Sequence, residues 1–251
     1  METQEFSESG APVYRYDDVK PKEFTPAFGD GENIEAISAH IETHIGKIES
    51  VFHEIVSDLV HIDVHWVKPT EKFPFHAMVT SGMSDKPMTV PEGLEDHQYS
   101  ELCVLLPGDW NIGGESYQTT EEAFKDEKNY WPVRWLKIIA RFPHEYNTWV
   151  GHGHTIPNGN NADPFADNTG FGCMLLFPSI SLGNQFFQLK VNDEKSINFY
   201  CLYPLYKEEM EFKLKKGADA LIDKFEKYNV TDVVDIKRRN TCLKKGLLGL
   251  W

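Results

Sequence analysis

The sequence predicts an α+β fold, in which a mixed central sheet carries a long N-terminal helix and two further helices. Three observations predict this class. Apolar residues recur at helical spacing over residues 34–59, and shorter segments have the alternating or continuously apolar pattern of strands. The segments follow in the order helix, three strands, helix, three strands, helix, which is typical of a mixed sheet covered by helices. With 251 residues, 41% of them hydrophobic, the chain is long enough to bury a sizeable core.

The first segment, residues 1–33, is polar and rich in proline, glycine and acidic residues. We expect it to be an extended, partly disordered lead-in to a single domain over residues 34–251. The predicted helix follows, with Asn33 as a suitable cap. Its apolar stripe is expected to pack on the sheet, and Glu35, Glu42 and Glu49 lie on the opposite face, toward solvent or a partner. The stripe consists of Ile34, Ile37, Ile41, Ile45, Ile48, Phe52, Ile55 and Leu59.

Three strands are predicted next, over residues 61–67, 75–84 and 99–107. The second runs into a turn at Gly82, and the third is continuously apolar toward its end, as expected of a central strand buried on both faces. A second helix is predicted over residues 131–141, ended by Pro143. Three more strands within residues 172–206 precede a last helix, which begins near Lys207 and is weakened at Gly217.

The chain is acidic, because 39 Asp and Glu residues against 25 Lys and Arg residues give a formal charge of −14. Residues 1–60 alone hold 13 acidic and 4 basic side chains. This charge repels phosphate backbones and so disfavours direct nucleic-acid binding. It favours encounter with a basic protein, although it equally suits a surface that keeps the protein soluble.

The sequence lacks a secretory signal pattern and an apolar run as long as a transmembrane helix. None of its four cysteines forms a Cys-x-x-Cys pair. We therefore expect a cytoplasmic protein in a reducing compartment that does not bind membranes. The short apolar tail over residues 247–251 is expected to fold back onto the domain, because so few residues bury too little area for stable anchoring.

Histidines form the strongest candidate for a chemical site. His152 and His154 in a glycine-rich loop, with His61 and Asp163, would suit the zinc of a metal-dependent hydrolase if the fold brought them together. The chain has no HExxH motif and no cysteine cluster, and the two loop histidines equally suit hydrogen bonding within the loop. The turn at residues 80–84 lacks the pattern of a nucleophile elbow, and the glycine loops lack phosphate-binding patterns. We expect no catalytic residue, no metal and no cofactor.

Several segments, taken in order, resemble the suppressor-of-fused domain family. The resemblance covers residues 35–240 and lies in the combined order of the segments, since each motif alone is weak. The segments are the strand and turn Phe75–Asp85, the strand Tyr99–Pro107 with Glu101, the helix Trp131–Arg141, the loop Asn147–Pro157, the junction Tyr203–Met210 with its glutamate pair, and Arg238-Arg239.

The resemblance implies an α/β sandwich without enzymatic activity that binds another protein. Single-domain bacterial members of the family are similar to immunity proteins, so the implied function is neutralisation of a basic toxin, such as a nuclease. A regulatory protein that sequesters a client, as in the Hedgehog pathway of animals, is the alternative. Charge points to Glu35, Glu42 and Glu49 as partner contacts. The resemblance points instead to Asp85 and to the loop carrying His152, His154, Asp163 and Asp167.

Overall fold

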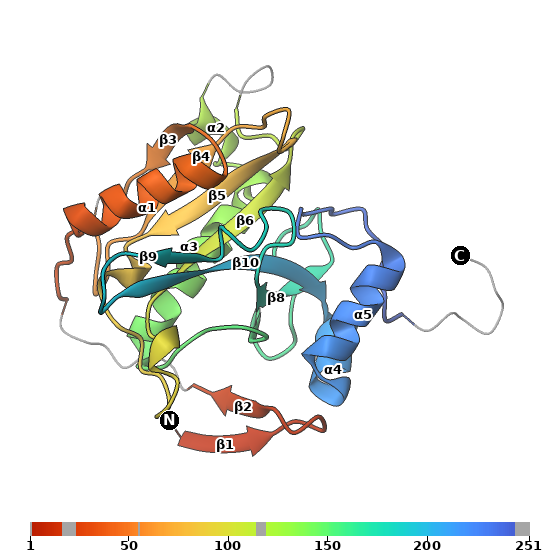
Figure 1. The fold of residues 1–251 in the computed structure, drawn as a ribbon. Coiled ribbons are helices and arrows are strands. Elements are labelled where there is room, and N and C mark those ends of the chain that lie inside the picture. The colour runs from red at the N-terminus through yellow and green to blue at the C-terminus, as the bar shows by residue number, and fades with distance from the viewer. Residues whose placement is uncertain (1, 17–23, 55, 114–118, 244–251) are drawn as a thin grey trace.

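The computed structural model describes residues 2–16, 24–54, 56–113 and 119–243. Its centre is a mixed sheet with helices on both faces, so the predicted α+β class is confirmed (Figure 1). The strands are β1 (Glu2–Phe6), β2 (Pro12–Arg15), β3 (Ile48–Phe52), β4 (Asp63–Val67), β5 (Phe75–Ser81), β6 (Ser100–Pro107), β7 (Thr155–Pro157), β8 (Phe171–Phe177), β9 (Gln188–Lys190) and β10 (Ser196–Tyr206). The helices are α1 (Gly31–His44), α2 (Thr120–Ala123), α3 (Glu127–Tyr146), α4 (Lys207–Lys216) and α5 (Ala218–Tyr228), with short 3-10 turns η1 (Met83–Asp85) and η2 (Glu95–His97).

The large sheet has the order β3-β4-β5-β6-β10-β8-β7, and β9 pairs with β10 beside this path. All its pairs are antiparallel except β10 with β6, where Cys201 lies opposite Cys103. The long strand β10 holds the sheet together, because its first half pairs with β6 and β9 and its second half with β8. The prediction that residues 99–107 form a central strand is confirmed, since β6 lies between β5 and β10.

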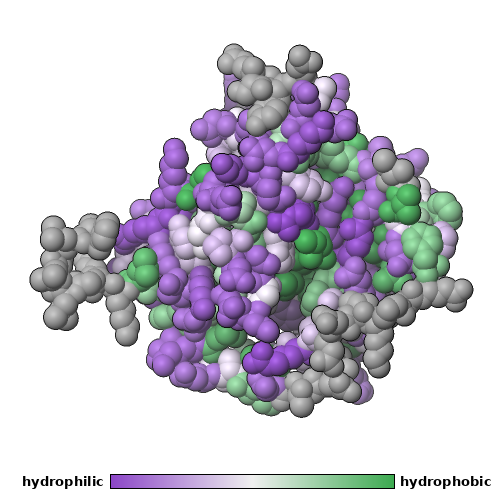
Figure 2. All heavy atoms as spheres, turned by 180° about the vertical axis from the view of Figure 1, so that it is seen from behind, coloured by the Kyte–Doolittle hydropathy of each residue, from purple (hydrophilic) through white to green (hydrophobic). Residues whose placement is uncertain are grey.

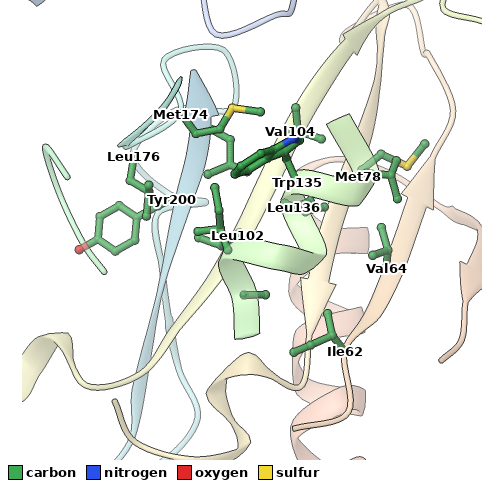
Figure 3. Packing of buried hydrophobic residues seen from close by; sticks show 14 of the residues in the cluster. Ile62, Val64, Met78, Leu102, Val104, Trp135, Leu136, Met174, Leu176 and Tyr200 are labelled. Carbon is green, nitrogen blue, oxygen red and sulfur yellow. The ribbon is translucent and has the colours of Figure 1, made fainter. Parts of the chain in front are cut away.

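The core has two parts, one on each face of the sheet. On one face α3 packs over alternate residues of the strands: Trp135 and Leu136 share a buried cluster with Val64, Met78 and Leu102, and Figure 3 shows Trp135 beside Val104 and Met174. On the other face Ile37 and Ile41 of α1, Met210 of α4 and Leu221 and Phe225 of α5 cover Val79, Cys103 and Leu105. Alternation along β6 explains both layers, because Leu102 and Val104 face α3 while Cys103 and Leu105 face α1.

The predicted helix over residues 34–59 is wrong after residue 44. α1 ends at His44, where Ile45 and Gly46 both donate a backbone hydrogen bond to the carbonyl of Ile41, and residues 48–52 form β3. Ile48 and Phe52 continue the four-residue spacing but are also an even number apart, so a strand places both on one face as well. The N-cap is Asp30 rather than Asn33, since its carboxylate accepts from the amides of Glu32 and Asn33.

The remaining helices also differ from prediction at their ends. α3 begins at Glu127 and passes through Pro143 to Tyr146, so this proline does not end it. Gly217 has a φ of +95° and separates α4 from α5, which makes two helices where one was predicted. None of the helices within the described residues combines the length and apolarity needed to cross a membrane.

Within the lead-in, β1 and β2 pair with each other, and the backbone amide of Ser9 donates to the carbonyl of Leu214 in α4. Its predicted partial disorder stays a prediction. The apolar tail over residues 247–251 lies outside the described part of the chain.

Candidate functional site

The turn after β5 is built around Gly82 and the buried carboxylate of Glu101. Gly82 has a φ of +99°, and a side chain there would overlap the carbonyl oxygen of His61. Glu101 accepts from the amide and hydroxyl of Ser84, at 2.9 and 2.7 Å, and from the hydroxyl of Thr80 at 2.6 Å. This turn therefore has a fixed conformation that places η1 against the start of α1.

Asp85, a predicted partner contact, joins η1 to α1. Its carboxylate accepts from the Nδ2 of Asn33 at 2.8 Å and from the amide of Asp30 at 3.0 Å. Burial raises the pKa of Asp85 above its usual value. The geometry gives this half-buried side chain a clear structural role, because it holds the first turn of α1 against the sheet.

Residues 151–170, which were expected to be a loop, include the short strand β7 and run beside β8. The ring of His152 is exposed and lies 4.2 Å from that of Phe177, whereas His154 is half-buried against Trp149, with 4.4 Å between ring centres. Burial and, second, the charge of Lys213 lower the pKa of His154 to about 4, so it is neutral at pH 7. Asp163 and Asp167 are exposed.

A shallow groove adjoins this loop. Asp167 lines it, together with Asp126, Glu127 and Lys128 at the start of α3. Three carboxylates and one lysine line the groove, so its charged lining is net negative.

The histidines predicted as metal ligands do not converge. Within the described residues, the ligand atoms that lie within 4.8 Å of one another belong to His53, His61 and Asp63, and this group excludes His152, His154 and Asp163. Sequence reasoning paired His61 with the wrong partners, because His53 was placed inside a helix. With β3 and β4 as antiparallel neighbours, His53 and Asp63 come together directly beyond the pair Phe52 and Val64.

The predicted glutamate face is only partly present. Glu35 and Glu42 are exposed on α1, and the carboxylate of Glu42 accepts from the amide of Ile48 at 3.3 Å. Glu49 is not on this helix: it lies on β3 and pairs with Lys68, with 2.7 Å between carboxylate and ammonium. The correction follows from the end of α1 at His44.

Sequence reasoning missed an exposed apolar group, which we call the Phe28 patch: Phe24, Phe28 and Val56. These side chains are 54%, 87% and 71% exposed. The patch lies on two paired segments, because the amide of Ala27 donates to the carbonyl of Ser57 at 3.1 Å and Pro26 bridges to Asp58. A view from behind shows a mostly hydrophilic surface on which hydrophobic side chains gather toward one side (Figure 2).

The Phe28 patch adjoins two other recognition features. Phe28 stands two residues before Asp30, the cap of α1, so it lies near the N-terminal end of that helix, whose first turn carries the exposed Glu32. β3 ends four residues before Val56 and, within the described residues, pairs with β4 alone. Exposed apolar rings beside carboxylates and a sheet edge are features that bind proteins. The sequence signal that could have indicated this patch is the pair Phe24 and Phe28 in an otherwise polar segment.

Comparison with known proteins places this arrangement among described folds. The family model for "Suppressor of fused protein (SUFU)" matches residues 58–239. No curated protein sequence matches the chain.

Three solved structures share the fold. A Neisseria gonorrhoeae FA 1090 protein described as a SUFU homolog has 16% identity and a TM-score of 0.61, with 85% of this chain and 98% of that chain covered. A chain of the Sufu–Fu complex has 12% identity, a TM-score of 0.57, and coverage of 83% and 92%. Drosophila Suppressor of Fused has 13% identity and a TM-score of 0.56, with 84% of this chain but only 51% of that longer chain covered. At these identities the likeness shows the fold alone.

Proposed function

This chain belongs to the suppressor of fused family, and from that premise we propose that it is a protein-binding module without catalytic activity. The observation that carries the proposal is the Phe28 patch, because three exposed apolar side chains on two joined segments suit contact with another protein. A chain of similar fold is part of the Sufu–Fu complex, which supports protein binding as the mode of action.

The partner we infer is a basic protein, and a toxin such as a nuclease is the first candidate. The net charge of −14 supports this, because opposite charge raises the rate of encounter. Glu35 and Glu42, exposed on the helix that follows the Phe28 patch in the chain, are the contacts we favour. The loop with His152, Asp163 and Asp167 is a second candidate surface, whereas Asp85 is engaged in structure. A regulatory client is the second candidate partner, favoured by the fold shared with the Sufu–Fu complex.

The toxin hypothesis is tested by genetics and co-purification. Products of the neighbouring genes are expressed with and without this chain, and we expect one to be toxic alone, to be harmless with the chain, and to co-purify with it. Complex formation should weaken with added salt, because screening reduces charge attraction. The toxin hypothesis is contradicted if the chain neutralises the toxicity of none of the neighbouring gene products. Co-purification of a non-toxic product would favour the regulatory client.

The Phe28 patch is tested by substitution. With the partner so identified, Phe28→Ser is expected to weaken binding roughly tenfold or more, because a buried aromatic ring at the centre of an interface contributes about 2 kcal/mol. Unfolding should be unchanged, since Phe28 is 87% exposed. Ile180→Ser is the matched control, because Ile180 is 64% exposed and outside the patch. Equal affinity of the two variants, measured by calorimetry, would place the interface elsewhere.

A further inference from the structure

Two imidazoles and a carboxylate converge where the chain passes from β3 to β4. The Nδ1 of His53 lies 2.8 Å from one carboxylate oxygen of Asp63, and the Nε2 of His61 lies 3.1 Å from the other. Burial is graded across the group, because the Asp63 side chain is 4% exposed, that of His61 20% and that of His53 70%. The group is therefore buried at Asp63 and open to solvent at His53.

The hydrogen bonds around Ser57 fix the tautomer of His61. The hydroxyl of Ser57 lies 2.6 Å from a carboxylate oxygen of Glu54 and 2.8 Å from the Nδ1 of His61. A hydroxyl has one hydrogen, and an ionised carboxylate only accepts, so Ser57 donates to Glu54 and accepts from the Nδ1–H of His61. Glu54 is held in this role by an ion pair with Arg141 and by the amide of Ile62.

Because the Nδ1 of His61 is engaged by Ser57, its Nε2 is the ring nitrogen available on the side of Asp63, and it lies 3.1 Å from a carboxylate oxygen. An imidazole nitrogen and a carboxylate oxygen are both metal-ligand atoms. His53 adds a second imidazole nitrogen to the same carboxylate, which provides the third ligand that a metal requires.

We propose that His53, His61 and Asp63 bind a zinc ion. Two imidazole nitrogens and one carboxylate oxygen are a ligand set that zinc prefers, whereas calcium and magnesium take sites richer in oxygen. Tetrahedral zinc separates its ligand atoms by about 3.3 Å, and one ligand atom from each of the three residues already lies within 4.8 Å of the other two. The contact from His61 through Ser57 to Glu54 orients the ligand from behind, as metal-bound histidines require. Three protein ligands leave one coordination position open on the side of His53.

The zinc site would support the Phe28 patch from beneath. Ser57 follows Val56 directly and accepts the backbone hydrogen bond of Ala27, so an ion bound to this network would stiffen both segments that carry the patch. The zinc proposal stands on its own geometry and does not depend on the proposed function.

The test uses the full chain, stripped with a chelator and titrated with Zn²⁺ in a calorimeter. We expect one equivalent to bind saturably and to raise the midpoint of thermal unfolding, because a ligand that binds the folded state alone stabilises it. His53→Ala should abolish both effects without unfolding the protein, since this side chain is mostly exposed. Ser57→Ala should weaken zinc binding roughly 10- to 100-fold through loss of the orienting hydrogen bond.

His44→Ala is the control, because His44 lies at the end of α1 and outside the group. It should bind zinc as the unsubstituted chain does. Absence of saturable binding to the folded chain would overturn the proposal. Unchanged zinc affinity in His53→Ala would also overturn it, because the ion would then be bound elsewhere.

Discussion

Replacing Arg238 by alanine is expected to lower the free energy of unfolding by roughly 3–5 kcal/mol, because it leaves a buried carboxylate without its partner. The guanidinium of Arg238 binds Glu209 through two hydrogen bonds of 2.6 and 2.7 Å, and Glu209 is completely buried. The same guanidinium donates to the carbonyl of Pro204 at 2.8 Å. Glu209 in turn accepts from the amide and hydroxyl of Thr241, so one ion pair joins α4, β10 and the C-terminal segment.

Arg239→Ala is the matched control for this prediction. Arg239 is exposed, and its guanidinium lies 3.8 Å from the ring centre of Tyr228. An exposed contact of this kind contributes about 0.5–1 kcal/mol. Urea denaturation of both variants, with the slope of the transition compared as well as its midpoint, measures the difference. A loss below about 1 kcal/mol for Arg238→Ala would show that water or another side chain replaces the guanidinium.

The second large effect is a pH dependence that Glu101→Gln is expected to remove. Burial raises the pKa of Glu101 to about 7 from the usual 4.5, against the opposing hydrogen bonds of Thr80 and Ser84. The folded protein therefore holds a proton that the unfolded chain releases at lower pH. The stability contributed by this group is complete below pH about 4.5 and is lost as pH rises through about 7. The loss is on the order of 3 kcal/mol.

Glutamine suits this site because its amide replaces the protonated oxygen. It can donate to the Oγ1 of Thr80, whose own hydrogen then turns to the carbonyl of Leu102. We expect Glu101→Gln to match the unsubstituted chain at pH 5 and to be more stable at pH 8. The measurement is the free energy of unfolding in urea at both pH values, with the exposed Glu121→Gln as control. Parallel pH profiles for the chain and for Glu101→Gln would show that another group titrates.

The fold could be predicted from the sequence wherever the spacing of apolar residues and the length of the segment indicated the same type of element. The alternation in residues 63–67, the apolar run of β6 and the stripe of α1 each allowed one interpretation. Residues 45–59 did not, because isoleucines at three- and four-residue spacing fit a helix until the chain reverses at Gly46. One wrong helix end had two consequences for the site, since it put Glu49 on the wrong element and hid the meeting of His53 with Asp63.

The roles of individual side chains were harder to predict from the sequence than the helices and strands. Asp85 and the terminal arginine could be singled out by resemblance, but what Asp85 binds depends on Asn33, and what Arg238 binds depends on Glu209. Such pairs lie tens of residues apart in the chain, and only the tertiary structure brings them together. The exposure of Phe28 could not be predicted for the same reason, because the side of this segment that faces solvent depends on its pairing with Ser57 and Asp58.

The ion pair between Glu209 and Arg238 also sets an order of events during synthesis. A ribosome releases Glu209 about thirty residues before the arginine that neutralises it, and at typical elongation rates this interval lasts a few seconds. During that time the carboxylate has no cation to bury with, so α4 cannot dock on its side of the sheet at its final stability. We therefore expect the growing chain to complete its fold only when its C-terminal segment emerges, and we expect a chain truncated before residue 238 to leave its last two helices more open to proteolysis.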